Sequence, residues 1–204
     1  ATGTVFPFVS STGAVLLDGR RHVLSVVRDV SVRKAHEREI ERLNHFYQLI
    51  SHINQAIVRQ KSRSELFHDI CEIIVHSGSF RLAWIGWHDE AAQLIMAVAV
   101  AGEASAYAEG IRVSSDAALP EGRGPSGTSV REGRIQVNNE LQRSAQMSPW
   151  REAAAAHGLH SVAAVPIVIE GRAVGALNVN SGETQAFGVR EVALLQDVVR
   201  DLAF

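Results

Sequence analysis

The chain has 204 residues, of which 46% are hydrophobic and 21% charged, enough for one core of ordinary domain size and part of a second. A formal net charge of -2 argues against a nucleic-acid surface, and no apolar run reaches the roughly 18 residues of a membrane span. The single cysteine, Cys71, excludes disulfide frameworks and cysteine-based zinc sites and is typical of a cytoplasmic protein.

Residues 1–30 have the short apolar runs of β-strands. We expect strands at Thr4 to Val9, Val15 to Leu17 and His22 to Val30, with a turn at Asp18-Gly19. So few strands cannot bury enough apolar surface to form a domain, so we expect them to pack against another part of the protein.

Residues 31–60 have helical periodicity, with Ser31 as the expected N-cap. Apolar residues recur three and four apart, and an Asn occupies one position of that seam, as in a coiled coil. The predicted seam consists of Ile40, Leu43, Tyr47, Ile50, Asn54 and Ile57. Two readings stay open, since this stripe can pair with a second copy of the chain or pack into the chain's own core.

A second helix is predicted from the capping-box pattern Ser62-Arg63-Ser64-Glu65 to Gly78. A hairpin follows, with strands at 81–87 and 94–101. The second of these strands is apolar throughout, which favours a central place in its sheet.

Residues 103–150 are rich in Gly, Ser and Pro, and irregular segments on a rigid scaffold often form binding sites. We expect short strands at 111–113 and 134–137, a short helix ending at Arg131, and a helix over 150–157. A strong hairpin over 161–179 precedes a last helix that starts at Phe187 and spaces Val192, Leu195, Val199 and Leu202 as heptads. The predicted fold class is α+β, an antiparallel sheet with helices on one side.

Residues 45–204 resemble a GAF domain. The resemblance rests on GPSGTSVREGRIQV (124–137), Pro149-Trp150-Arg151, SVAAVPI (161–167), GRAVGAL (171–177) and FGVREVALL (187–195). Upstream, VLSVVRDVSVRK (23–34) resembles the final strand and exit of a PAS domain, and the rest of a PAS domain is missing. Residues 31–60 are then the signalling helix that joins the two.

The resemblance implies a sensory module, profilin- or PAS-like in fold, that encloses a small-molecule pocket and forms a homodimer through its first and last helices. We expect a cytoplasmic signal-transduction protein. Since the sequence starts at Ala1, we expect a fragment whose output domain, a histidine kinase or a cyclic-di-GMP enzyme, lies beyond Phe204.

The expected pocket combines aromatic side chains with polar groups. Its candidate residues are Trp84, Trp87, Tyr107, Arg123, Ser126, Asn138, Trp150, Arg151 and His160. Aromatic residues of this kind are also ordinary core, and alternation along a strand puts Trp84 and Trp87 on opposite faces. At most one of these two is therefore expected in the pocket.

Two other kinds of site are weaker. Gly122 to Gly127 has the glycine spacing of a phosphate loop, but Thr128 stands where that motif needs Lys, which leaves at most an anion held near Ser126 at the helix start. His88, His157 and His160 could be ligands of a metal or haem. Histidine spacing without other ligands is weak evidence for such a site, so we expect these residues to be structural. No cofactor is predicted.

Two alternatives to sensing remain. GAF-like proteins include free methionine sulfoxide reductases, which use attacking and resolving cysteines, and Cys71 has no resolving partner here. We therefore expect no enzymatic activity from this segment. The other alternative is a dimerisation spacer whose pocket is filled by side chains, which a cavity too small for any ligand would favour.

Overall fold

The computed structural model describes residues 6–37, 40, 44, 48, 51–52, 62–78 and 80–202. The chain divides into two units, Ala1–His45 and Phe46–Phe204, which are described separately below. Leu43, Tyr47, Ile50, Asn54 and Ile57 of the predicted seam lie outside the described residues. Ile40 is helical and 58% exposed.

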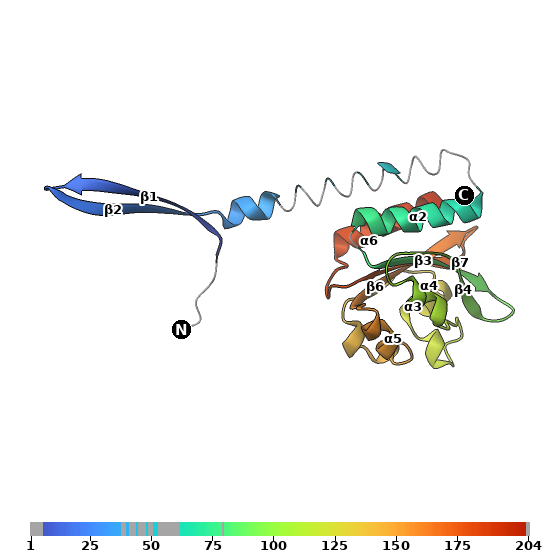
Figure 1. Cartoon of the computed structure of the whole chain (residues 1–204). Helices are drawn as coiled ribbons and strands as arrows, with labels where there is room; N and C mark the ends of the chain where they lie inside the picture. The colour runs from blue at the N-terminus through green and yellow to red at the C-terminus, as the bar shows by residue number, and fades with distance from the viewer. Residues whose placement is uncertain are drawn as a thin grey trace. The chain divides into compact units, whose positions relative to one another are not determined.

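The first unit contains one antiparallel hairpin, β1 (Phe8–Leu17) and β2 (Arg20–Asp29) (Figure 1). The predicted turn at Asp18-Gly19 is confirmed, and both residues have positive φ, 52° and 76°, as the tight two-residue hairpin turn requires. The predicted break between Val9 and Val15 is wrong. Ser10 to Ala14 continue the strand because they pair with β2, where the Thr12 and Ser25 hydroxyls share a hydrogen bond of 2.9 Å.

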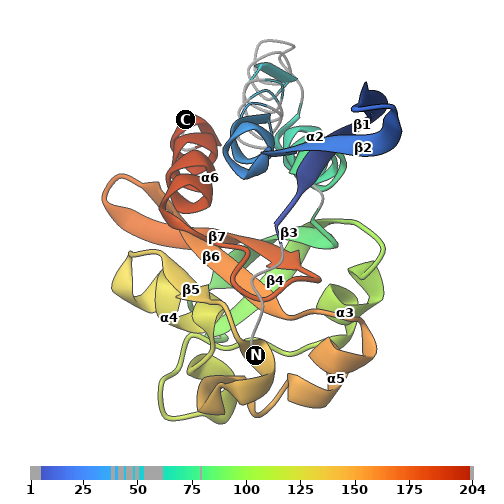
Figure 2. The ribbon, with the colours of Figure 1, turned by 90° about the vertical axis from the view of Figure 1, so that its left-hand side faces the viewer.

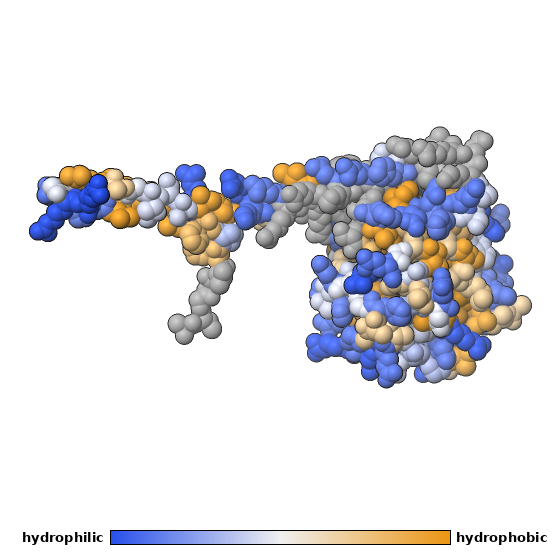
Figure 3. Space-filling view, in the orientation of Figure 1, coloured by the Kyte–Doolittle hydropathy of each residue, from blue (hydrophilic) through white to orange (hydrophobic). Residues whose placement is uncertain are grey.

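Apolar side chains of this hairpin are exposed in the described structure, as the orange residues along it in Figure 3 show. Val26 is 58% exposed and its neighbour Val27 56% exposed. Successive residues of a strand point to opposite faces, so both faces of the hairpin carry apolar groups.

Residues 31–37 are helical. The Asp29 carboxylate accepts a hydrogen bond from the Ser31 backbone N–H at 2.8 Å. Hydrogen bonding by the Ser31 side chain, and then by its backbone N–H, lowers the pKa of Asp29. Lys34 N–H donates to the Val30 carbonyl, so Val30 is the N-cap and the predicted N-cap, Ser31, is the first helical residue. Asp29 supplies the side-chain contact to this helix start.

The second unit contains a five-stranded antiparallel sheet in the order β4-β3-β7-β6-β5. Its strands are β3 (Leu82–Asp89), β4 (Leu94–Ala101), β5 (Gln136–Asn138), β6 (Ser161–Ile169) and β7 (Arg172–Ser181). The apolar strand β4 lies at an edge of this sheet, where the sequence predicted a central strand. Glu170 and Gly171 connect β6 to β7 with φ values of 50° and 77°.

Helices cover both faces of this sheet (Figures 1 and 2). The helices α2 (Arg63–Gly78) and α6 (Val189–Leu202) lie on one face. On the other lie α3 (Ser105–Gly110), α4 (Pro125–Glu132) and α5 (Arg151–Ala156). The α+β class with an antiparallel sheet is confirmed. The prediction that helices lie on one side of the sheet is wrong, because the segments between β4 and β6 also form short helices that cover the second face.

The core under α2 and α6 is formed by the odd-numbered residues of the central strands, such as Ile85, Val165 and Leu177. Leu195, Val199 and Leu202 of α6 are buried in it, and Val192 is partly buried against it. The heptad stripe of the last helix thus packs onto the domain's own sheet. A homodimer formed through α6 would therefore have to use a face of this helix other than its heptad stripe.

The core under α3, α4 and α5 is formed by even-numbered strand residues, among them Leu82, Trp84 and Val162. The segment 111–113 is not a strand, although Val113 accepts a hydrogen bond from Ile95 N–H on β4. The helix α3, in a segment predicted to be irregular, buries Tyr107 and Ala108 here. Across the described residues, no helix combines the length and apolar character needed to cross a bilayer.

Candidate functional site

A small cavity lies in the core between the sheet and α3, α4 and α5. Its volume is about 20 Å³, room for roughly one water molecule. The lining residues are Trp84, Tyr107, Ile111, Val113, Gly124, Pro125, Ser126, Met147, Trp150, Val162 and Asn180. The structure therefore brings together Trp84, Tyr107, Ser126 and Trp150 of the predicted pocket residues around one small space.

Aromatic side chains from three segments form the walls of the cavity. Trp84 is held in β3 opposite Asn178 of β7, and Tyr107 comes from α3. Trp150 precedes α5, and its indole N–H donates to the Arg112 carbonyl at 3.0 Å. Its ring packs on Gly124, where a Cβ would overlap the ring carbons, so this position needs glycine for steric reasons.

Two asparagines of β7 face the core that contains the cavity, because Asn178 and Asn180 alternate with residues of the opposite core. The Asn178 amide accepts a hydrogen bond from the Ser126 hydroxyl at 2.6 Å and donates to the Ala176 carbonyl at 3.1 Å. Asn180 is 2% exposed, and its Oδ1 is buried without a hydrogen-bond partner. The cavity thus contains one unsatisfied acceptor.

The cavity is electrically neutral, since none of its lining residues is an Asp, Glu, Lys, Arg or His. Burial raises the pKa of Tyr107, so its hydroxyl stays protonated at physiological pH. An ion in this space would have no opposite charge among the lining groups, and burying an unpaired charge is costly. The arrangement favours a neutral polar occupant.

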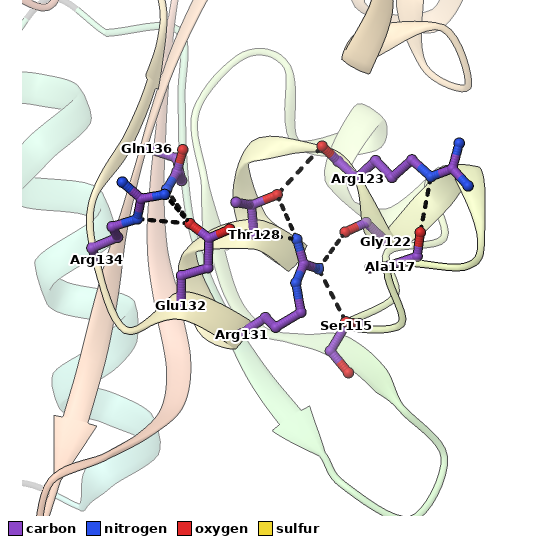
Figure 4. A network of polar contacts seen from close by, with 9 residues as sticks. All are labelled: Ser115, Ala117, Gly122, Arg123, Thr128, Arg131, Glu132, Arg134 and Gln136. Carbon is purple, nitrogen blue, oxygen red and sulfur yellow. Dashed lines mark hydrogen bonds and ion pairs between the residues drawn. The ribbon is translucent and has the colours of Figure 1, made fainter.

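A polar network fastens the loop beside the cavity to α4 (Figure 4). The Arg131 guanidinium donates to the Gly122 carbonyl at 2.8 Å and to the Ser115 carbonyl at 3.2 Å. At the end of α4, Glu132 accepts hydrogen bonds from Arg134 and Gln136. Segment 115–122 connects two residues of the cavity lining, Val113 and Gly124. The Arg131 side chain therefore holds this segment against α4, the helix that lines the cavity.

The glycines of the candidate phosphate loop serve backbone packing. A Cβ at Gly122 would overlap the Asp116 carbonyl oxygen, and a Cβ at Gly127 would overlap the Ser114 carbonyl oxygen. The glycine spacing thus follows from the close approach of chain segments, and it requires no phosphate.

The remaining predicted pocket residues do not line the cavity. Trp87 faces the other core, with its ring 5.8 Å from that of Phe67 and under the Arg63 guanidinium, as the alternation along the strand predicted. Arg123 donates to the Ala117 and Ala118 carbonyls, and Arg151 donates to the Ser144 carbonyl.

Asn138 and His160 also lie away from the cavity lining. The Asn138 Oδ1 accepts a hydrogen bond from Glu140 N–H at 3.1 Å, which shapes the chain after β5. His160 is half-buried, and its backbone pairs with Ser181 and Leu141.

The other histidines considered as ligands make local contacts. His157 Nδ1 lies 2.9 Å from the Ala153 carbonyl at the end of α5, and His88 Nε2 lies 2.8 Å from the Ser115 hydroxyl. Among the described residues, no group of three or more His, Cys, Asp or Glu is arranged to hold a metal ion.

Cys71 lies in α2, in the core on the opposite face of the sheet from the cavity. It is fully buried, and burial raises the pKa of its thiol to about 12. The only sulfhydryl of the chain is thus both protonated and separated from the cavity by the sheet.

The sequence prediction missed Asn178 and Asn180. Polar residues that alternate along a strand are usually assigned to a solvent face. A signal was available, because the adjacent strand β6 reads SVAAVPIVI, which is apolar on both faces and indicates burial of its neighbour. Met147, Ile111, Val113 and Val162 carry no pattern that separates cavity lining from ordinary core.

Comparisons with solved structures identify the same fold in proteins of different activities. The free methionine-R-sulfoxide reductase of Neisseria meningitidis, solved with its substrate, has a TM-score of 0.64 at 14% identity, covering 78% of this chain and 86% of that one. The GAF domain of an Acinetobacter phosphoenolpyruvate-protein phosphotransferase has a TM-score of 0.59 at 14% identity, covering 79% and 90%. The corresponding domain from Coxiella burnetii has a TM-score of 0.62 at 13% identity, covering 78% and 90%.

At these identities the likeness concerns the fold alone. The search of curated proteins returns no match. The family comparison gives the assignment, because the model described as GAF domain matches residues 60–204, most of the chain. The chain belongs to the GAF domain family.

Proposed function

We propose that the second unit is a sensory module that binds a small molecule in the cavity between the sheet and α3, α4 and α5. The single observation that carries this proposal is the unpartnered Asn180 Oδ1 in a small, aromatic-walled cavity. Buried polar groups are nearly always hydrogen-bonded, so an exception beside a cavity marks a place where a further molecule is expected. Trp84, Tyr107, Ser126 and Trp150 are the proposed contacts.

The placement of the cavity supports a regulatory role. It lies on one face of the sheet, and the helices that begin and end the domain, α2 and α6, lie on the other. A ligand that prefers one arrangement of the sheet would shift the population of the helix arrangements packed on it. We propose that these helices pass the signal to a second copy and to an output domain of a cytoplasmic signalling protein, such as a histidine kinase or a cyclic-di-GMP enzyme.

A methionine sulfoxide reductase activity has little support from this chain. The reaction requires a reactive thiolate near the substrate, whereas Cys71 is protonated, buried and on the far face of the sheet from the cavity. No second cysteine is present to resolve an oxidised intermediate.

The dimerisation spacer is the second candidate, and the cavity volume is the observation that favours it. A space of about 20 Å³ admits roughly one water molecule. Binding of anything larger must therefore be accompanied by movement of a lining residue, which distinguishes the two candidates experimentally.

The test is native mass spectrometry of the purified chain before and after incubation with a small-molecule metabolite mixture. Sensing predicts an added mass that is lost from a variant with Asn180 replaced by Leu, together with a rise in the unfolding temperature of the wild type only. Retention of no molecule and an unchanged unfolding temperature would assign the domain to the spacer class. The same spectra report the subunit count and so test homodimerisation.

A further inference from the structure

We propose that the cavity is the closed form of a site for a small, uncharged, planar molecule that donates a hydrogen bond to Asn180 Oδ1, and that Trp150 moves to admit it. The inference rests on the proposed sensory function and names the chemical class of its ligand.

The hydrogen-bond direction follows from Asn180. Its Oδ1 can only accept, and it is buried without a partner in the described structure. By contrast, Ser129 donates to the Ala164 carbonyl at 3.1 Å and Ser126 donates to Asn178. The other buried side-chain atom without a partner among the described residues, Arg151 Nε, does not belong to the cavity lining. A buried acceptor without a hydrogen bond lowers the stability of the fold. Proteins keep such unfavourable groups mainly at functional sites.

The charge of the ligand follows from the lining. No charged side chain lines the cavity, and the Tyr107 hydroxyl remains neutral. An anion or cation would be buried without compensation. The molecule that fits is therefore neutral at the pH of binding.

The shape of the ligand follows from the walls. Trp84, Tyr107 and Trp150 offer ring faces and edges, which favour a planar occupant in stacked or edge-to-face contact. A single ring is larger than the water-sized space of about 20 Å³, so one wall must move.

Trp150 is the wall that moves in this proposal, because it lies in a connecting segment rather than inside a strand or helix. Trp84 is in β3, which is hydrogen-bonded to strands on both sides, and Tyr107 is within α3. Trp150 lies between the short helix at Ala145–Met147 and α5, and its side chain is held by one hydrogen bond, to the Arg112 carbonyl. Rotation of its indole away from Gly124 would vacate ring-sized space beside Asn180.

The experiment uses the full chain and three probes of matched ring size. Pyrazole is neutral and carries one N–H donor, isoxazole is neutral and has none, and pyrazole-4-carboxylate is an anion. Binding is measured by NMR chemical-shift titration of the wild type, W150F, N180L and S129A. W150F keeps an aromatic ring but removes the hydrogen bond to Arg112, and S129A is the control for loss of a buried polar group that lies outside the cavity lining.

We expect pyrazole to bind the wild type and to bind W150F several-fold more tightly, because closure no longer competes as strongly. We expect N180L to weaken pyrazole binding by about tenfold or more and S129A to leave it unchanged. Isoxazole and the carboxylate should bind weakly or not at all to every variant. If N180L does not fold, N180V takes its place, since a β-branched residue suits a strand.

The proposal is overturned if isoxazole binds as well as pyrazole, if the Asn180 variants keep full pyrazole affinity, if the carboxylate binds best, or if pyrazole shifts no resonance of either the wild type or W150F. These outcomes are separate from failure of sensing itself. A protein that retains a different small molecule in native mass spectrometry while ignoring pyrazole remains a sensor of another ligand class. A protein that retains nothing fails both tests.

Discussion

At the scale of single residues, two buried polar side chains differ in whether they are hydrogen-bonded. Ser129 and Asn180 are both almost fully buried and both face the core beneath α3, α4 and α5. Ser129 donates its hydroxyl proton to the Ala164 carbonyl, whereas the Asn180 Oδ1 has no partner. The Ser129 hydrogen bond stabilises the fold, and the unpartnered Asn180 acceptor destabilises it.

This contrast predicts opposite effects of two apolar substitutions on the free energy of unfolding. N180L should stabilise the domain by about 1 kcal/mol, since it removes an unsatisfied acceptor in favour of a side chain of similar size. S129A should destabilise it by about 1 kcal/mol, since it removes a satisfied hydrogen bond. Urea unfolding followed by circular dichroism gives both values. A loss of stability in both N180L and N180V would mean that the amide is satisfied and would remove the observation on which the cavity argument depends.

Cys71 gives a second residue-scale prediction, on reactivity. Burial raises its pKa to about 12, so iodoacetamide should label the native protein at pH 8 only as fast as the protein unfolds. The raised pKa stabilises the fold below about pH 8.5, the ordinary thiol range, and this contribution is lost as pH rises towards the folded pKa. Rapid labelling under native conditions, measured by mass spectrometry, would contradict the burial of this side chain.

Helix ends and loop anchors set the behaviour of single elements. The predicted capping box is confirmed, since Ser62 N–H donates to the Glu65 carboxylate at 3.0 Å and Glu65 N–H donates to the Ser62 hydroxyl at 3.3 Å. S62A should therefore cost about 1 kcal/mol of stability, measured by thermal unfolding. The matched variant S62T keeps the hydroxyl and should cost much less, and equal losses in the two would show that the hydroxyl contributes nothing.

Arg131 gives a prediction about the loop beside the cavity. R131A removes the donors to the Ser115 and Gly122 carbonyls, so amide hydrogen exchange across 115–122 should accelerate while exchange in α2 and α6 stays unchanged. R134A serves as the control, since Arg134 is paired with Glu132 outside this loop. Equal exchange in R131A and the wild type would show that other contacts hold the loop.

Elements were predictable from sequence where local chemistry decides them. The hairpin turn at Asp18-Gly19 and the start of α2 were found because turn and cap residues are specific. The helix α3 was missed because ASAYAE lacks both a cap hydrogen bond and a clear apolar period. The exposure of β4 at the sheet edge was missed because strand order depends on long-range pairing, which an apolar run does not encode.

The candidate site was predictable only in part, and for a physical reason. Residue type correctly identified four cavity-lining residues, Trp84, Tyr107, Ser126 and Trp150. The same reasoning wrongly selected Arg123 and Arg151, whose guanidinium groups donate hydrogen bonds to nearby backbone carbonyls instead. Long polar side chains satisfy local acceptors in loops, and this competition is visible only once the chain is folded. Asn180 could be recognised only from the folded structure, in which its Oδ1 is buried without a hydrogen-bond partner.

The whole molecule consists of a unit with two cores and a hairpin whose apolar side chains are exposed. We expect residues 60–204 to fold alone, because both cores are formed within them. Its unfolding temperature should equal that of the main transition of the full chain, measured by calorimetry. A large drop on removal of residues 1–59 would show that the domain needs them for stability.

Strand β7 is a shared wall between two compartments. Leu177 and Val179 pack under α2 and α6, while Asn178 and Asn180 face the opposite layer. In the proposed sensor, a single strand backbone therefore separates the cavity side of the sheet from the side that carries α2 and α6. A shift of this strand would reach both compartments at once, so communication across the domain needs no chain of intermediate side chains.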